Sequence, residues 1–256
     1  RQRQMCIRDR WEDATTKFGF NKRRTYLLGK GLDSVMNYPF KNAVLDFVKG
    51  KPAEQAMTEI LTICEHYPAP AMDTALNFLS THDTERALTV IADEPANGRG
   101  RAWQSGRCVT GDAYEEGLLR LRMAYAIIYT LPGVPCLYYG DEIAMQGYRD
   151  PFNRAFFRWD AHEQRLRPVL AQLAQLRHTC EAFRTGQLRV LRAEDGILHY
   201  QRVGKVETAE IIVNRTEHII VETLASGKST EVNPMGFTIV VEEVGHNPNH
   251  SYYDYV

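Results

Sequence analysis

The side chains best suited to chemistry stand directly after two short apolar runs of the sequence. His82 and Asp83 follow the run over 76–80, and Asp141 follows the run over 134–139. A carboxylate can move a proton or stabilise positive charge, and an imidazole can donate a hydrogen bond to a hydroxyl group. Short apolar runs are typical of buried strands, and catalytic side chains gather where barrel strands end. These acidic motifs are the first indication of an active site.

Helices are predicted before, between and after these runs. Apolar residues spaced i, i+3, i+4, i+7 indicate a helix that opens at Pro52. A second helix is predicted from a capping box formed by Asp112 and Glu115 to Leu131, and a third over 166–176. Apolar strands that alternate with helices favour a parallel sheet or a barrel.

The texture of the sequence changes after Gly186. Short, partly alternating β-branched segments, separated by Gly, Asn and Lys, are typical of a small antiparallel β domain. We therefore predict an α/β part over 11–186 and an all-β sandwich domain over 187–245. Residues 246–256 are predicted to be a tail, with the aromatic run 252–255 outside the strands and disordered.

The bulk composition indicates an ordinary globular protein. The 256 residues include 31 Lys and Arg against 32 Asp and Glu, a formal net charge of −1. No excess charge therefore attracts a nucleic acid or an anionic membrane, and no apolar run reaches the roughly 18 residues that span a bilayer. Five scattered cysteines argue against a zinc site and weakly favour a reducing, cytoplasmic location. We expect neither a cofactor nor a metal.

The first ten residues, RQRQMCIRDR, are similar to translated adapter sequence. They also lack the apolar core of a signal peptide. We therefore expect residues 1–10 to be non-native, exclude them from fold reasoning, and expect the native N-terminal part to be missing.

Four ordered segments share the motifs of one enzyme family. Residues 78–86 read F-x-x-x-H-D-x-x-R, residues 132–142 read PG-x-P-x-x-YYGDE, and residues 147–154 read G-x-x-DP-x-NR. Residues 11–14 read WEDA. Together they resemble the alpha-amylase superfamily of glycoside hydrolases, and the third motif is similar to its neopullulanase and cyclomaltodextrinase branch. Any one motif is weak, but the order and spacing make chance similarity improbable.

The resemblance implies the C-terminal part of a (β/α)8 barrel, about strands six to eight. It implies that Asp83 stabilises the transition state and that His82 hydrogen-bonds the same sugar. Arg86 would orient nearby carboxylates or bind substrate through its planar fork. Asp150 and Arg154 would contact a sugar on the donor side. The substrate would be an alpha-glucan oligosaccharide. Members of this branch often dimerise, so the resemblance also suggests that the parent protein forms a homodimer.

Several of these residues also have a plainer structural interpretation. Asp83 is a candidate cap for a helix that begins at Thr84. Asp150 and Arg154 are equally consistent with an internal ion pair that closes their loop. Asp141 and its neighbour Glu142 are expected to shape a turn rather than to touch substrate.

Two aromatic side chains lie near these motifs. Aromatic rings suit the apolar faces of sugars, so Tyr139 either stacks on a sugar, as a substrate-binding residue, or packs internally. Trp159 is expected to pack in the core.

The rest of the family's catalytic set is not found in this sequence. The nucleophile motif D-x-R-x-D does not occur, and the position of the general acid falls within residues 1–10. We therefore predict a fragment of a retaining hydrolase of alpha-glucosidic bonds in maltodextrins, cyclodextrins or pullulan, inactive by itself. One alternative is a non-catalytic amylase-fold relative. The intact H-D-x-x-R motif argues against this alternative. Another is a carbohydrate-binding protein, although Tyr200 is the one strand aromatic of the β domain that looks exposed.

Overall fold

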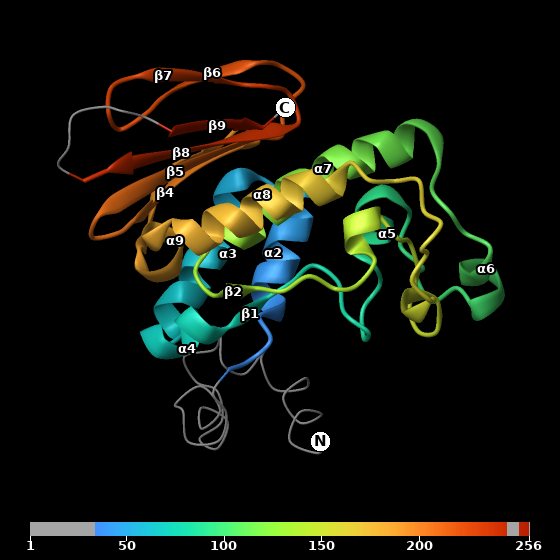
Figure 1. The fold of residues 1–256 in the computed structure, drawn as a ribbon. Helices are drawn as coiled ribbons and strands as arrows, with labels where there is room; N and C mark the ends of the chain where they lie inside the picture. The colour runs from blue at the N-terminus through green and yellow to red at the C-terminus, as the bar shows by residue number, and fades with distance from the viewer. Residues whose placement is uncertain (1–33, 245–250, 256) are drawn as a thin grey trace.

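The computed structural model describes residues 34–244 and strand β9 (Ser251–Tyr255) (Figure 1). The segment 1–10 and the motif that begins at Trp11 lie outside these residues. Within them, no helix is both long and apolar enough to cross a membrane.

Two short parallel strands carry the loops of the candidate site. β1 (Leu76–Asn77) pairs with β2 (Val134–Pro135), and Met36 forms a parallel bridge to Leu76. Both strands are shorter than the runs that predicted them, because ladder pairing ends at Asn77 and Pro135 and the chain then turns into the site loops.

Buried amides lock these segments together. Asn77 donates to the carbonyl oxygen of Pro132 at 2.7 Å and accepts from the amide of Asn37 at 3.0 Å. The Asn37 side chain also accepts from the N–H of Phe40 in the first turn of α2 (Tyr38–Lys49). One pair of asparagines therefore fixes where α2 begins relative to both strands.

Three longer helices confirm the periodicity of the sequence. α3 (Ala53–His66) begins directly after Pro52, and α7 (Gly111–Thr130) and α8 (Leu166–Thr179) occupy the other two predicted stretches. Shorter helices complete this part: α4 (Ala69–Thr74), α5 (Ala87–Ala92), α6 (Arg101–Ser105), α9 (Glu181–Thr185), and the 3-10 turns η2 (Asp141–Ile143) and η3 (Phe152–Arg154).

The predicted capping box at Asp112 is wrong. α7 begins one residue earlier, which places Asp112 inside its first turn, and the N-cap residue Thr110 makes no side-chain cap bond. The carboxylate of Asp112 still lies near the positive end of the helix dipole, where negative charge is favourable.

The C-terminal part is an antiparallel sheet in the order β3-β4-β5-β8-β9, with a separate β6–β7 hairpin. Its strands are β3 (Gln187–Glu194), β4 (Ile197–Val203), β5 (Glu207–Asn214), β6 (Ile220–Thr223), β7 (Ser229–Val232) and β8 (Gly236–Glu243). β3 thus begins at the residue after Gly186. Leu224, Val232 and Val240 belong to a small apolar cluster that ties the hairpin to the sheet.

The predicted tail is wrong over 251–255. These residues form β9, which pairs antiparallel with β8 so that Tyr255 lies opposite Phe237. Without this partner, β8 would present one row of its backbone groups as an unpaired edge. The segment was not recognised as a strand because it is rich in tyrosine and poor in aliphatic residues, whereas its backbone pairing with β8 favours one.

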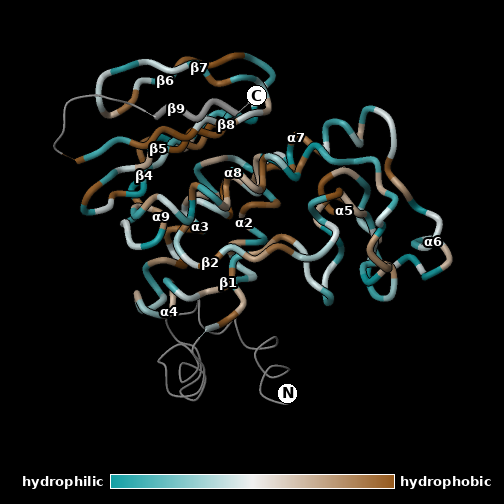
Figure 2. Tube along the Cα trace, viewed as in Figure 1, coloured by the Kyte–Doolittle hydropathy of each residue, from teal (hydrophilic) through white to brown (hydrophobic). Residues whose placement is uncertain are grey.

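The sheet and the helices share one hydrophobic core. Figure 1 shows α2, α7 and α8 between the five-stranded sheet and the β1–β2 pair. Leu198, Ile211 and Ile239 of the sheet belong to the same buried cluster as Phe47 of α2 and Ile127 of α7. Figure 2 shows hydrophobic stretches along β5 and β8 and through the helices beneath them.

Buried polar contacts join the sheet to the end of α7. Tyr200 is fully buried, and its hydroxyl shares a 2.6 Å hydrogen bond with that of Thr130. Arg202, also buried, donates to the Thr130 carbonyl oxygen at 2.8 Å. The expectation that Tyr200 is exposed is therefore wrong, because β4 is an inner strand of the sheet and this side chain faces α7.

Tyr200→Phe is expected to lower the free energy of unfolding by about 1 kcal/mol, the net value of a buried hydrogen bond. Urea denaturation of the full chain measures it. Combining Tyr200→Phe with Thr130→Val should cost less than the sum of the two single changes, because both remove the same bond. Additive losses would contradict this assignment.

Candidate active site

The loop after β1 presents His82 and Asp83 near the surface. The side chain of His82 is 59% exposed and that of Asp83 is 16% exposed, with Nε2 of His82 3.1 Å from Oδ2 of Asp83. A compact turn holds them: the Asp83 N–H donates to Oγ1 of Thr81, and the Thr81 N–H donates to Oγ1 of Thr84, both at 3.1 Å. The turn fixes an imidazole and a carboxylate side by side.

Asp83 does not cap a helix. α5 begins at Ala87, and the Ala87 N–H donates to Oγ of Ser80 at 2.8 Å. The hydroxyl of Ser80, and not Asp83, therefore accepts from the first N–H of this helix, whose N-cap residue is Arg86.

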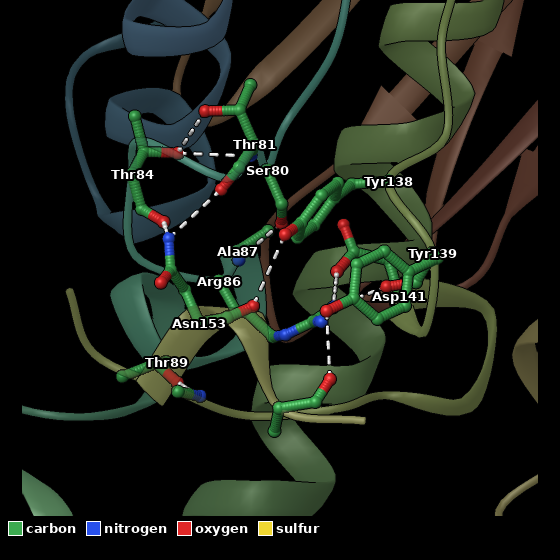
Figure 3. Close-up of polar contacts among 12 residues, drawn as sticks. Ser80, Thr81, Thr84, Arg86, Ala87, Thr89, Tyr138, Tyr139, Asp141 and Asn153 are labelled. Carbon is green, nitrogen blue, oxygen red and sulfur yellow. Dashed lines mark hydrogen bonds and ion pairs between the residues drawn. The ribbon is translucent and has the colours of Figure 1, made fainter. Parts of the chain in front are cut away.

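Asn153 clamps the turn that holds His82 and Asp83 from a neighbouring loop, and Figure 3 shows its bonds to the flanking residues Thr81 and Thr84. This side chain is fully buried, and its Nδ2 lies 3.3, 2.9 and 2.7 Å from the carbonyl oxygens of Thr81, His82 and Thr84. Two N–H groups shared among three carbonyl oxygens hold the backbone of the turn in place. The asparagine of the G-x-x-DP-x-NR motif therefore supports the H-D motif, a role that sequence reasoning missed.

Arg154 extends this support to the side chains. Its Nε donates to the His82 carbonyl oxygen at 2.9 Å and lies 3.1 Å from Oδ1 of Asp150. Its Nη2 lies 3.6 Å from Oδ1 of Asp83. The internal ion pair of Asp150 with Arg154 is therefore present, and both side chains remain about half exposed.

Arg86 lies beneath the site in the core. It is fully buried, pairs with Oδ1 of Asp141 at 3.1 Å and donates to the Tyr139 carbonyl oxygen at 2.7 Å (Figure 3). Its guanidinium carbon lies 4.8 Å from the ring centres of Tyr138 and Tyr139. Arg86 thus orients Asp141 rather than Asp83, and its burial is at odds with the expectation that it binds substrate.

Asp141 shapes the turn after β2, as predicted. It begins η2, directly after Gly140, whose φ of 87° favours glycine. A Cβ at Gly140 would also collide with Sδ of Met145. Oδ2 of Asp141 accepts from the Tyr125 hydroxyl at 2.6 Å, so three elements meet at this carboxylate.

Burial raises the pKa of Asp141 to about 6, although hydrogen bonds from Ser80 and Tyr125 and the charge of Arg86 favour the ionised form. The native state therefore binds this proton more tightly than the unfolded state, whose carboxyl has the ordinary value of 3.8. The stabilisation is complete below that value and is lost as the pH rises through about 6.

Relative to Asp141→Asn, the wild-type chain is expected to lose roughly 2 kcal/mol of stability between pH 4 and pH 7. Urea denaturation of both proteins across this range measures the difference. A wild-type advantage that grows as the pH rises would show that the Asp141 pKa is lowered instead.

The two aromatic residues of interest have opposite environments. Tyr139 packs on Arg86 and donates its hydroxyl proton to the Ala155 carbonyl oxygen at 2.8 Å, while 40% of the residue stays exposed. Trp159 is 89% exposed, so the prediction that it packs in the core is wrong. Its neighbours Arg158 and Asp160 form an exposed ion pair, which indicates that this loop projects into solvent.

A second aromatic cluster, which sequence reasoning missed, braces the loop that carries Asn153. The Trp103 ring packs against Arg99 and Arg107, with each guanidinium carbon 4.4 Å from the ring centre. Tyr148 packs edge-on against it at 5.2 Å and donates to the Glu94 carbonyl oxygen at 2.6 Å. The sequence did contain a sign of this cluster, because arginines flank Trp103 in a loop that is otherwise rich in small residues.

The chemistry of this site rests on carboxylates and imidazole. In the part of the chain that the structure describes, no group of three or more His, Cys, Asp or Glu side chains is placed to hold a metal ion. Burial raises the pKa of the Cys64 thiol to about 11 and that of Cys180 to about 12, so neither is a ready nucleophile.

Comparison with known proteins shows which family this chain resembles. Residues 14–182 match the family described as alpha amylase, catalytic domain. The chain is 31% identical over 212 residues to an amylopullulanase from Thermoanaerobacter thermohydrosulfuricus, an alignment that covers 77% of the chain and 13% of that protein. It is 32% identical over 197 residues to a cyclomaltodextrinase from Geobacillus thermopakistaniensis, covering 75% of the chain and 30% of that protein.

The fold has solved counterparts. The ligand-free cyclic alpha-maltosyl-(1→6)-maltose hydrolase from Arthrobacter globiformis superposes with a TM-score of 0.72 at 25% identity, over 86% of this chain and 46% of that one. The chain thus spans less than half the length of each of these relatives. The cyclomaltodextrinase similarity agrees with the branch that the G-x-x-DP-x-NR motif indicated. The chain belongs to the alpha-amylase family.

Proposed function

We propose that this chain supplies one part of the active site of a retaining glycoside hydrolase that cleaves alpha-glucosidic bonds in maltodextrins, cyclodextrins or pullulan. The observation that carries the proposal is the turn in which His82 and Asp83 lie 3.1 Å apart, at the end of a parallel strand. The names of the amylopullulanase and cyclomaltodextrinase relatives support this substrate class.

The three parallel segments at Met36, β1 and β2 are, in this proposal, strands six, seven and eight of a (β/α)8 barrel. Their order along the chain equals their order in space, as a barrel requires. The sheet over β3–β9 and the β6–β7 hairpin form the C-terminal β-sandwich domain. The similarity in fold to the cyclic maltosyl-maltose hydrolase supports this placement.

Each residue of the turn then has a role in the reaction. Asp83 binds hydroxyl groups of the sugar at the cleavage point, and its negative charge stabilises the oxocarbenium-like transition state. His82 donates a hydrogen bond to the same sugar. Arg154, held by Asp150 and the His82 carbonyl oxygen, orients Asp83 and contacts a donor-side sugar.

The same proposal predicts that the chain alone does not hydrolyse alpha-glucans. A retaining mechanism needs a nucleophile and a general acid about 5–5.5 Å apart, and no D-x-R-x-D motif occurs among the 256 residues. The general acid would stand two positions before Trp11. Turnover of maltoheptaose by the purified chain would contradict this part of the proposal. The cytoplasmic location and the homodimer stay predictions.

Sequencing the source DNA upstream of the codon for Trp11, with long reads, tests the proposed function. We expect G-E-x directly before Trp11 and D-x-R-x-D further upstream. A genuine Arg8-Asp9-Arg10, with both upstream carboxylates replaced, would favour the non-catalytic amylase-fold relative and overturn the enzyme assignment.

A further inference from the structure

His199 lies buried between two glutamates in the C-terminal sheet. It stands on β4, and its Nε2 lies 2.6 Å from Oε1 of Glu210 on β5. Its Nδ1 lies 3.2 Å from Oε2 of Glu222 on β6. All three side chains are buried. Both nitrogens of one imidazole therefore face carboxylate oxygens away from solvent.

Glu210 also accepts hydrogen bonds from two other donors. Nε2 of Gln201 donates to it at 2.9 Å, and the Ala225 N–H lies 3.1 and 3.2 Å from its two oxygens. Burial raises the pKa of Glu210, but the hydrogen bonds from His199, Gln201 and Ala225 outweigh burial and hold that pKa below its ordinary value. On its other side, β8 places the uncharged Val240 opposite Glu210. Glu210 is therefore held as a carboxylate.

Glu222 has a cation on the side away from the imidazole. Its Oε1 pairs with Arg192 of β3, which also pairs with the exposed Glu194 at 2.8 Å. β7 places the uncharged Thr230 opposite Glu222, and the hairpin turn carries one further cation, Lys228. The charged groups in contact with the imidazole therefore come from β5 and β6, with the guanidinium of β3 directly behind.

These contacts indicate the charge of His199. A neutral imidazole has one N–H and one bare nitrogen, and a carboxylate only accepts hydrogen bonds. A neutral ring would therefore leave one nitrogen against an oxygen with no proton between them, and buried polar groups without a partner are costly. A protonated ring donates to both carboxylates. It also balances the two glutamates against two cations, His199 and Arg192.

The same contacts join the β6–β7 hairpin to the sheet. Figure 1 shows the hairpin over the face of the sheet that points away from the helices. The hairpin and the sheet share no backbone ladder, and the apolar cluster between them is small. Glu222 and Ala225 belong to the hairpin, whereas His199 and Glu210 belong to the sheet. The imidazole therefore bridges two elements that meet through side chains.

We infer that His199 is a doubly protonated imidazolium and acts as a pH-sensitive latch, which holds the β6–β7 hairpin on the sheet through Glu222 and Glu210. Histidine is the side chain whose charge changes near neutral pH. The docked hairpin binds the proton more tightly than the undocked hairpin, so docking is favoured at low pH and weakens as the pH rises. The latch does not depend on the proposed function.

The protons on the ring nitrogens test the charge of His199 directly. Nitrogen-15 magnetic resonance distinguishes a ring nitrogen that carries a proton from a bare one. Comparison with His199→Gln identifies the signals of this ring. We expect both nitrogens of His199 to carry a proton in the full chain at about pH 7. One bare nitrogen at that pH would overturn the inference.

Hydrogen–deuterium exchange of the full chain tests the latch. Between about pH 6.5 and about pH 9, the protection factors of the amides in β6 and β7 are expected to fall about tenfold more than those in β4 and β5. His199→Gln should remove this difference, because glutamine does not titrate. His162→Gln, which replaces an exposed histidine outside the sheet, should keep it.

Glu222→Gln is the second variant, because it keeps the shape of the side chain and removes the charge on the hairpin. It should lower the protection of the hairpin amides about tenfold at neutral pH and flatten their pH dependence. Hairpin protection that does not change with pH in the wild-type chain, or that changes equally in His199→Gln, would show that the latch is wrong. If His199→Gln does not fold, the ring nitrogens of the wild-type chain and Glu222→Gln still decide the question.

Discussion

Arg86→Met is expected to lower the free energy of unfolding by about 3–5 kcal/mol, the typical cost of removing one partner from a buried ion pair. The change leaves the buried carboxylate of Asp141 without its cation and removes the hydrogen bond to the Tyr139 carbonyl oxygen. It also empties the space between two tyrosine rings. Urea denaturation at neutral pH measures the loss.

Two further variants separate this effect from a general loss of positive charge. Adding Asp141→Leu to Arg86→Met should recover part of the stability, because the stranded carboxylate is then gone. Arg165→Met removes an exposed cation that pairs with Glu115 and Glu163 and should cost about 1 kcal/mol. A cost for Arg86→Met as small as that for Arg165→Met would contradict the buried pair.

Asp83→Asn is expected to lower kcat about 10³-fold in a catalytically complete enzyme that contains this chain, with a smaller change in KM. The substitution keeps the shape of the side chain and removes the negative charge that faces the developing oxocarbenium ion. Hydrolysis of maltoheptaose under saturating conditions measures kcat. The protein's melting temperature shows whether the change is confined to catalysis.

Asp150→Asn is the matched comparison, because it neutralises another carboxylate of the same site. Asp150 pairs with Arg154 at the surface. It should change KM about tenfold at most and leave kcat nearly intact. If both variants lowered kcat equally, Asp83 would have no special position in the transition state.

The sequence predicts best what depends on neighbours along the chain. Pro52 and the apolar spacing after it place α3 to within a residue, and the change in texture at Gly186 marks where β3 begins. The H-D-x-x-R motif places His82 and Asp83 together because they are adjacent residues at the end of a strand. A sequence motif therefore predicts the geometry well where the residues in contact are neighbours along the chain.

Contacts between distant segments could not be predicted in the same way. Arg86 and Asp141 are 55 residues apart, and only the pairing of β1 with β2 brings them together. Tyr200 looked exposed because alternation along β4 does not reveal that α7 covers that face. Trp159 was expected to be buried because its side chain is large and apolar, whereas the loop that carries it projects from the site.

The binding site of an alpha-glucan on this chain tests the central claim most directly. Chemical-shift mapping of the isotopically labelled chain during a maltose titration locates that site residue by residue. We expect the largest shifts at the backbone amides of His82, Asp83, Asn153 and Arg154, with little change across β3–β8. Shifts confined to β3–β8 would contradict the proposed active site and would favour a carbohydrate-binding domain instead.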